Sequence, residues 1–208
     1  MQRQVIFILG GPGAGKSTEG RLLARAYGAL HISAGDCLRA EAAKPGSELA
    51  GTINDDIRNG RIVDGRVTTV LLHRKMLEHP DKRLVFIDGY PRSVDNYETF
   101  IDLVGSVDLG LIVLDCADDV LRDRIQQRIL SGSTRADDNP ESFVKRMAVF
   151  KHETRALFQR FETQGRLHRV QSTNDVDETH RRVQSVVDGL LKAAEPAFAS
   201  PGARARAL

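Results

Sequence analysis

The chain has 208 residues, of which 41% are hydrophobic and 28% charged, as is typical of a folded domain with a hydrophobic core. A net charge of +2 is too small to favour nucleic acid or a membrane surface, and no apolar run approaches the ~18 residues of a membrane span. The two cysteines, Cys37 and Cys116, exclude a disulfide framework and favour a reducing compartment. An apolar strand begins by residue 5, so we expect no targeting peptide and a location in the cytoplasm, with the nucleus as an alternative.

The first predicted element is a strand over residues 5–9, an apolar run that leads directly into a glycine-rich turn. This turn, residues 10–18, has the spacing G-x-x-x-x-G-K-S and is followed by a helical pattern over 17–27. A strand, such a turn and a helix in this order are typical of a loop that wraps nucleotide phosphates with its backbone N–H groups. Lys16 adds a positive charge, and the helix N-terminus faces the same anion. We therefore predict nucleotide binding rather than a glycine turn without a ligand.

The rest of the chain alternates between apolar strands and amphipathic helices. Strands are predicted at 30–32, 84–87, 109–114 and 167–170. Helices are predicted at about 36–43, 47–58, 66–77, 93–104, 117–130, 140–161 and 176–193. This alternation predicts an α/β fold in which helices cover both faces of a parallel sheet, giving three layers.

Some finer expectations follow from the same patterns. The helix over 66–77 is expected to bury Val67, Val70, Leu71 and Met76. One domain is expected over residues 1–192, and residues 193–208, rich in Ala, Pro and Arg, are expected to form a mobile tail.

Asp88 directly follows the buried strand at 84–87, at the edge of the sheet where the phosphate loop lies. A carboxylate there can hold Mg²⁺, directly or through water, beside a nucleotide's phosphates. The alternative is a cap for the helix over 93–104. The hydroxyl of Ser17 is a second candidate for contact with Mg²⁺.

Six arginines lie near two segments that interrupt the alternation, a helical insert at about 33–63 and a loop at 131–138. They are Arg39, Arg92, Arg124, Arg128, Arg135 and Arg146. Each alone would be read as a surface arginine or half of a weak ion pair. As a set they match phosphate oxygens, and phosphoryl transfer between two nucleotides needs fixed cations because two polyanions must meet. The interrupting segments are then lids that exclude water, and Asp137 and Asp138 are expected to tether the lid or its arginines.

With these motifs the chain resembles the nucleoside monophosphate kinase family, and within it the short-lid UMP-CMP kinases and their cytosolic adenylate kinase relatives. The resemblance is carried by residues 10–18, 31–41, 87–92 and 135–139, and it covers about residues 4–192. It implies a P-loop NTPase fold with a five-stranded parallel sheet. It also implies that residues 33–63 bind a nucleoside monophosphate (NMP) and that residues 129–138 form a short lid over ATP.

The resemblance further implies a role for each matching residue. Those that bind ATP would be Gly11, Pro12, Gly13, Ala14, Gly15, Lys16, Ser17, Thr18, Arg124, Arg128 and Asn174. Those that bind the monophosphate would be Ser33, Ala34, Arg39, Arg61, Ile62, Val63, Gly89, Tyr90, Pro91, Arg92, Asn96, Arg135 and Arg146. Those that act on the transferred group would be Lys16, Arg92, Arg128, Arg135 and Arg146. Mg²⁺ would assist, held by Asp88 through water, and the partners would be small nucleotides, without nucleic acid, membrane or a second subunit.

Two positions bear on the acceptor base. Ala34 stands where adenylate kinases usually carry threonine, and Asn96 where they usually carry glutamine. Both residues are those usual in UMP-CMP kinases, and a changed set of buried polar groups alters which base finds partners. The sequence therefore favours UMP or CMP over AMP. It departs from the family's usual residues at Ser17, Ile129, Ser93 and residues 63–65, and its lid is one residue longer.

Three alternatives remain. The first is an adenylate kinase, which converts ATP and AMP into two ADP. The second is a GTPase-like switch or ATP-driven binding module, although the guanine motif Asn-Lys-x-Asp is absent from the sequence. The third is a nucleotide-binding scaffold without catalysis, against which the presence of Lys16, Asp88 and all six arginines argues.

Overall fold

The computed structural model describes residues 2–133, 135 and 137–198. Five strands form one parallel sheet in the order β2-β3-β1-β4-β5. The strands are β1 (Gln4–Gly10), β2 (Leu30–Ser33), β3 (Leu84–Asp88), β4 (Val107–Asp115) and β5 (Leu167–Gln171). The predicted α/β fold with a five-stranded parallel sheet is confirmed.

The helices agree with the sequence pattern to within a few residues at most ends. They are α1 (Lys16–Tyr27), α2 (Ala34–Ala42), α3 (Ala50–Arg58), α4 (Gly65–Leu77), α5 (Val94–Val104), α6 (Asp118–Leu130), α7 (Pro140–Thr163) and α8 (Val176–Phe198). The prediction of a tail from residue 193 is wrong in its first part, because α8 continues through Phe198. Ala194 still packs against the hydrophobic core, which favours continuation of the helix. Residues 199–208, and residues 134 and 136 of the predicted lid, lie outside the described residues.

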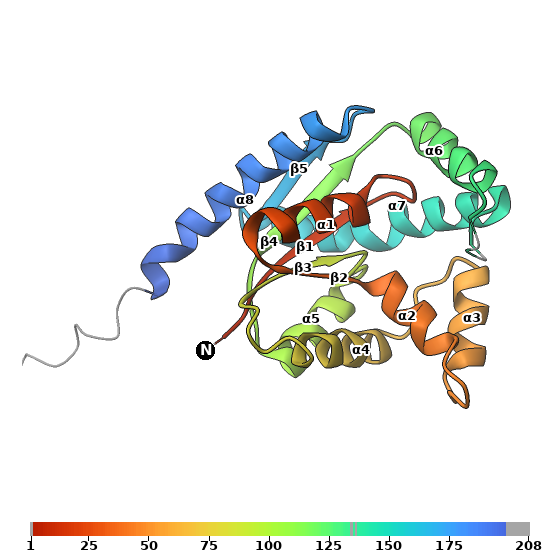
Figure 1. Ribbon diagram of the computed structural model, residues 1–208, viewed down its shortest axis with the longest axis horizontal. Helices are drawn as coiled ribbons and strands as arrows, with labels where there is room; N and C mark the ends of the chain where they lie inside the picture. The colour runs from red at the N-terminus through yellow and green to blue at the C-terminus, as the bar shows by residue number, and fades with distance from the viewer. Residues whose placement is uncertain (1, 134, 136, 199–208) are drawn as a thin grey trace, which may run out of the picture.

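Two hydrophobic clusters fill the space between the sheet and its two helical layers. Figure 1 shows α1 and α8 on one side of the sheet and α4 and α5 on the other. On the α1–α8 side, Leu23, Val183 and Val187 are fully buried against β1, β3 and β4. On the other side, the core includes Leu72, Phe100, Leu157 and Phe161 from α4, α5 and α7. Since β1 is covered on both faces, its residues from Val5 onward are buried without alternation, as the apolar run at 5–9 predicted.

Helix α4 buries Met76 and partly buries Val67 and Leu71, as the sequence predicts, but it does not bury Val70. Thr68 and Thr69 are buried, whereas Val70 is 36% exposed, so the expected burial of Val70 is wrong. The Thr69 hydroxyl donates to the carbonyl oxygen of Gly65 at 2.7 Å and lies 2.6 Å from the hydroxyl of Tyr90. Satisfied hydrogen bonds allow these threonines to be buried where an apolar residue was expected.

Helices α2 and α3 project beyond the carboxyl edge of the sheet and have a small hydrophobic cluster of their own. Its buried residues are Leu38, Ile53 and Val63, and Val67 and Leu71 of α4 pack against it. The Ser33 side chain caps α2 by accepting from the backbone N–H of Asp36. The insert therefore has a hydrophobic cluster of its own and is joined to the main core through α4 and through Ala34 and Cys37 of α2.

We expect replacement of a central aromatic residue to test the core directly. Phe161 is fully buried in an edge-to-face contact with Tyr97 at 5.0 Å, so Phe161→Ala should lower the free energy of unfolding by about 3–5 kcal/mol. Urea denaturation measures this change. As a control, Leu77→Ala at a side chain that is 61% exposed should change it by less than about 0.5 kcal/mol. Equal effects of the two substitutions would contradict the assigned core.

Candidate active site

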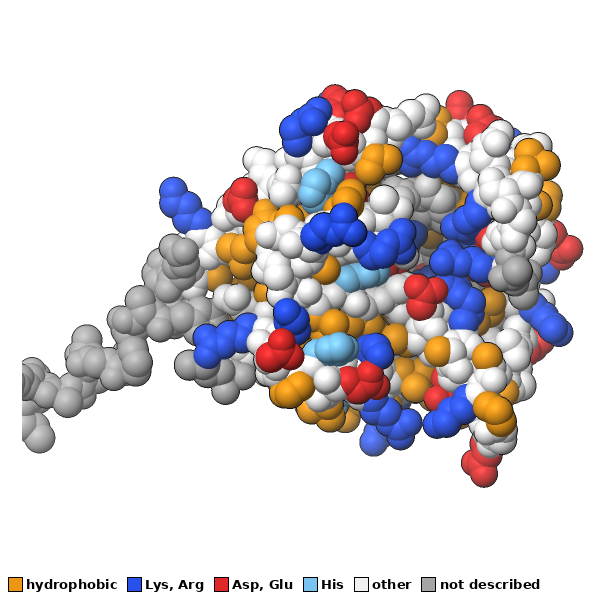
Figure 2. Space-filling view, in the orientation of Figure 1, with side chains coloured by type: hydrophobic (Ala, Val, Ile, Leu, Met, Phe, Trp, Pro, Cys, Tyr) orange, Lys and Arg blue, Asp and Glu red, His pale blue; other side chains and the backbone are white. Residues whose placement is uncertain are grey.

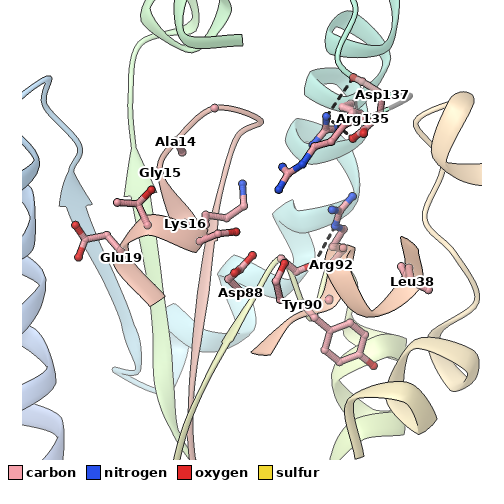
Figure 3. A pocket seen from close by; sticks show the side chains of 18 of the residues that line it. Ala14, Gly15, Lys16, Glu19, Leu38, Asp88, Tyr90, Arg92, Arg135 and Asp137 are labelled. Atoms are coloured by element: carbon pink, nitrogen blue, oxygen red, sulfur yellow. Dashed lines mark hydrogen bonds and ion pairs between the residues drawn. The ribbon is translucent and has the colours of Figure 1, made fainter. Parts of the chain in front are cut away.

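A cleft of about 490 Å³ opens at the carboxyl edge of the sheet, where the register places Ile8 of β1 and Ser33 of β2 level with Asp88 of β3. The edge where parallel strands end is where such sheets bind ligands. Lysine and arginine side chains gather around a hollow on this side of the molecule (Figure 2). Figure 3 shows Lys16, Asp88, Arg92 and Arg135 converging on the cleft from different elements.

The phosphate loop, residues 10–18, forms one wall of the cleft. Gly15 begins α1 with a φ of +91°, in a conformation that favours glycine, and leaves the first N–H groups of the helix directed outward. The Lys16 ammonium donates to the carbonyl oxygens of Gly10 and Gly11, at 2.8 Å each. Burial lowers the pKa of Lys16 to about 7, although the nearby carboxylate of Asp88 opposes this shift. An anion in the loop would offset this cost of burying the charge.

Asp88 is 3% exposed, and its Oδ2 lies 2.6 Å from Nε2 of His31 on the neighbouring strand β2. The alternative role of Asp88 as a helix cap is not observed, because Ser93 caps α5 through the N–H of Asn96. Since His31 engages one oxygen, the other oxygen of Asp88 stays available to water beside the phosphate loop. Among the described residues, no group of three or more His, Cys, Asp or Glu could enclose a metal. This arrangement fits Mg²⁺ held through water and phosphate oxygens rather than by a protein cage.

The arginines of the cleft have carboxylate or carbonyl partners. Arg128 binds Asp138 through two nitrogens, and Arg146 lies 2.6 Å from Asp137, so the predicted tethering of arginines by Asp137 and Asp138 is confirmed. Arg92 donates to the carbonyl of Gly89 at 3.0 Å. Burial, followed by repulsion from Arg146, lowers the pKa of Arg92 to about 10.

The carboxylate of Asp36 on α2 lies between two arginines of the cleft. Arg39, one turn along the same helix, donates to it at 2.5 Å, and Arg135 lies 3.6 Å from it. This contact brings the predicted lid against the insert.

One end of the cleft, here called the donor-base end, is formed by residues 172–174 after β5. Arg124 of α6 donates to the hydroxyl of Ser172 at 3.1 Å and to the carbonyl of Thr173 at 2.5 Å. Ser172 in turn donates to the carbonyl of Ala14, which fixes this segment to the phosphate loop. Asn174 accepts a hydrogen bond from Arg124 at 3.2 Å. These contacts form a polar wall of the cleft beside Arg124.

The opposite end, here called the acceptor end, is formed by the insert, α4 and the start of α5. Its lining includes Ser33, Ala34, Leu38, Ile57, Ile62, Val63, Thr68, Tyr90 and Asn96. Arg61 also lines the cleft, and its side chain binds Asp55 and Asp56. A largely apolar lining with a few polar side chains, among them Thr68 and Asn96, is suited to a planar base.

The cleft brings together nearly all the site residues expected from the sequence. Of those residues, Gly11, Pro12 and Pro91 do not line it. Gly11 lets the phosphate loop pack closely on α6, because a Cβ at this position would lie 2.6 Å from the Leu121 side chain. Pro91 is buried behind the cleft and follows Tyr90 through a cis peptide bond.

A family model for adenylate kinase matches residues 8–166 of this sequence. The chain belongs to the adenylate kinase family. The expected resemblance to nucleoside monophosphate kinases is therefore confirmed, and the protein is an enzyme of that class.

Curated relatives of the family include UMP-CMP kinases and a uridylate kinase. The UMP-CMP kinase of Danio rerio is 36% identical over 194 residues, which cover 90% of this chain and 98% of that protein. The UMP-CMP kinase of Xenopus laevis is 37% identical, over 90% of this chain and all of that protein. The uridylate kinase of Saccharomyces cerevisiae is 36% identical, over 89% of this chain and 91% of that protein.

Several residues of this family member's cleft were missed by the sequence analysis. They are Glu19, Arg21, Leu38, Ile57, Thr68, Val176 and Thr179. Leu38 and Ile57 carried an apolar signal that did not distinguish the core from the cleft. Thr68 carried no signal, because its place beside Asn96 depends on how α4 and α5 pack. The pairing of His31 with Asp88 was missed for the same reason, since it requires β2 and β3 to be neighbours.

The lowered pKa of Lys16 predicts proton uptake when nucleotide phosphates bind. Near a polyphosphate the ammonium is favoured, so binding of Mg·ATP should take up more protons at pH 8, above the pKa of about 7, than at pH 6, below it. Titration calorimetry in two buffers of different ionisation enthalpy measures this uptake. The Lys16→Met variant should lose it, and equal uptake by the wild type at both pH values would contradict the assignment.

Proposed function

We propose that the protein transfers the terminal phosphoryl group of ATP reversibly to UMP or CMP, giving ADP and UDP or CDP, with the help of Mg²⁺. One observation supports this proposal: residues 172–174 and the insert line one cleft together with its lysine and arginine side chains. An enzyme that only hydrolyses or binds ATP has no need of a second base site facing the same phosphates.

The cations divide according to their neighbours. Lys16 and Arg128 lie with the phosphate loop and α6 and would hold the triphosphate, whereas Arg39 and Arg92 lie toward the acceptor end and would hold the monophosphate. Arg135 of the lid and Arg146 of α7 would bridge the acceptor phosphate and the transferred phosphoryl group. Arg124 would stack on the donor adenine, with Asn174 beside it.

Catalysis would come from positioning and fixed charge. The acceptor is already a phosphate anion, so no general base is required. Cations fixed before the substrates arrive stabilise the charge that spreads over the moving phosphoryl group. The carboxylates of Asp36, Asp137 and Asp138 would release their arginines as phosphates replace them.

Mg²⁺ would be held by Asp88 through water, with the Ser17 hydroxyl as a second contact, and would neutralise charge on the donor phosphates. Asp88 would also stabilise the charged form of Lys16, because its carboxylate partly offsets the lowering of the Lys16 pKa by burial.

The pyrimidine acceptor is supported by Ala34 and Asn96 in the cleft lining, which match UMP-CMP kinases rather than adenylate kinases. It is also supported by the names of the relatives, UMP-CMP kinase and uridylate kinase. The insert at 33–63 and the lid at 129–138 would close over the substrates and exclude water. We also propose that the protein is a monomer and works in the cytoplasm. Separately, the described part of the chain contains no helix that could span a membrane.

Initial rates with ATP and each monophosphate test this function. We expect kcat/KM for UMP or CMP to exceed that for AMP by about tenfold or more, because Asn96 and Ala34 change the polar partners offered to the base. A preference for AMP of the same size would favour the adenylate kinase alternative. Failure to transfer phosphate to any monophosphate would refute the proposal.

Arg92→Ala should lower kcat by about 10²- to 10³-fold, since it removes a fixed cation from the centre of the cleft. Arg155→Ala on the exposed surface of α7 is the matched control and should leave kcat unchanged. Thermal unfolding followed by circular dichroism checks that both variants fold. Wild-type turnover in a folded Arg92→Ala protein would remove Arg92 from the reaction.

A further inference from the structure

Gly65, the first residue of α4, lies directly against the side chain of Asn96. A Cβ added to Gly65 would be 2.5 Å from Nδ2 of Asn96 and 3.5 Å from its Cα. The φ of Gly65 is not positive, so its backbone conformation does not require glycine. Glycine is therefore needed here for its small size, because the Asn96 carboxamide occupies the space that a side chain would fill.

The hydrogen bonds of Asn96 determine which end of its carboxamide is which. Its Oδ1 accepts from the backbone N–H of Arg92 at 3.3 Å. Because that N–H can only donate, the oxygen must face it, and Nδ2 forms the other end. Nδ2 has no hydrogen-bond partner among residues 2–133, 135 and 137–198, and Asn96 lines the acceptor end of the cleft. The side chain therefore offers a donor to whatever base enters.

The backbone around this contact is fixed on both sides. Tyr90, which is 2% exposed, donates from its hydroxyl to the carbonyl of Asn96 at 2.6 Å. The Thr69 hydroxyl lies 2.7 Å from the carbonyl oxygen of Gly65 and 2.6 Å from the Tyr90 hydroxyl, and its one proton can be donated to either. Ser93 accepts from the N–H of Asn96 at 3.2 Å. Since neither helix start can move easily, a side chain at position 65 would displace the carboxamide instead.

We infer that Gly65 is a specificity-determining residue that fixes Asn96 with its donor toward the acceptor base, and that the enzyme thereby favours UMP over CMP. This inference rests on the proposed pyrimidine acceptor. Uracil carries a carbonyl oxygen at C4, which accepts a hydrogen bond, whereas cytosine carries an amino group there, which would meet Nδ2 donor to donor. Thr68 also favours uracil. Its hydroxyl donates to the carbonyl of Asp64, so its oxygen is left to accept a hydrogen bond from the uracil N3–H.

Two substitutions test the inference through the ratio of kcat/KM for UMP to that for CMP. In the wild type we expect this ratio to be about ten or more. Asn96→Asp keeps the acceptor for Arg92 N–H but replaces the donor by an oxygen, so the ratio should fall at least about tenfold. Aspartate in the first turn of α5 is compatible with the helix. Gly65→Ala should raise KM for UMP by about tenfold and lower the ratio, while KM for ATP stays unchanged.

Gly189→Ala is the matched control, because nothing lies within 4 Å of a Cβ at that position, and it should change neither KM nor the ratio. A wild-type ratio near or below one would overturn the inference while leaving the proposed function intact. So would an Asn96→Asp variant whose rates with UMP and CMP fall equally, even if Gly65→Ala fails to fold. If the wild type transfers phosphate to no monophosphate, the proposed function fails, and this inference fails with it.

Discussion

The burial of several cations side by side is the constraint on which this cleft depends. Lys16, Arg92 and Arg146 are crowded together where the sheet ends, and the pKa of each is lowered by burial and by its neighbours. Asp137 compensates Arg146, whereas the ammonium of Lys16 and the guanidinium of Arg92 are held by backbone carbonyls. The protein is thus built around a concentration of positive charge that becomes favourable only when polyanions enter. Stability given up in the empty cleft is recovered as affinity for phosphate.

The parts that the sequence predicted well are those whose signal is local. The strand at 5–9 and the glycine spacing of the phosphate loop are contiguous in the chain, so pattern and geometry correspond directly. The same holds for helix α7, where Asn139 caps the first turn and Pro140 follows at a position that needs no N–H donor. The arginines could be placed near the two interrupting segments from the sequence, but their division between the two nucleotides came from the resemblance to a family.

What the sequence could not predict depends on contacts between distant elements. Val70 looked like a core residue, but Thr69 takes the buried place because Tyr90, 21 residues further on, supplies a partner for its hydroxyl. The pairing of His31 with Asp88 needs two strands that are separated in the chain to lie side by side. Hydrophobic periodicity identifies a face, but it cannot say which polar groups will find partners on that face.

The two ends of the cleft are anchored to different parts of the molecule. Residues 172–174 are joined to the phosphate loop through Ser172, so the donor-base end belongs to the rigid sheet. The acceptor end is lined in large part by the insert, whose residues Leu38, Ile53 and Val63 form a separate cluster. Substitutions in the insert can therefore accumulate over evolution without disturbing the phosphate loop. A lineage with this architecture can diversify in the nucleotides it phosphorylates while its phosphoryl donor stays the same.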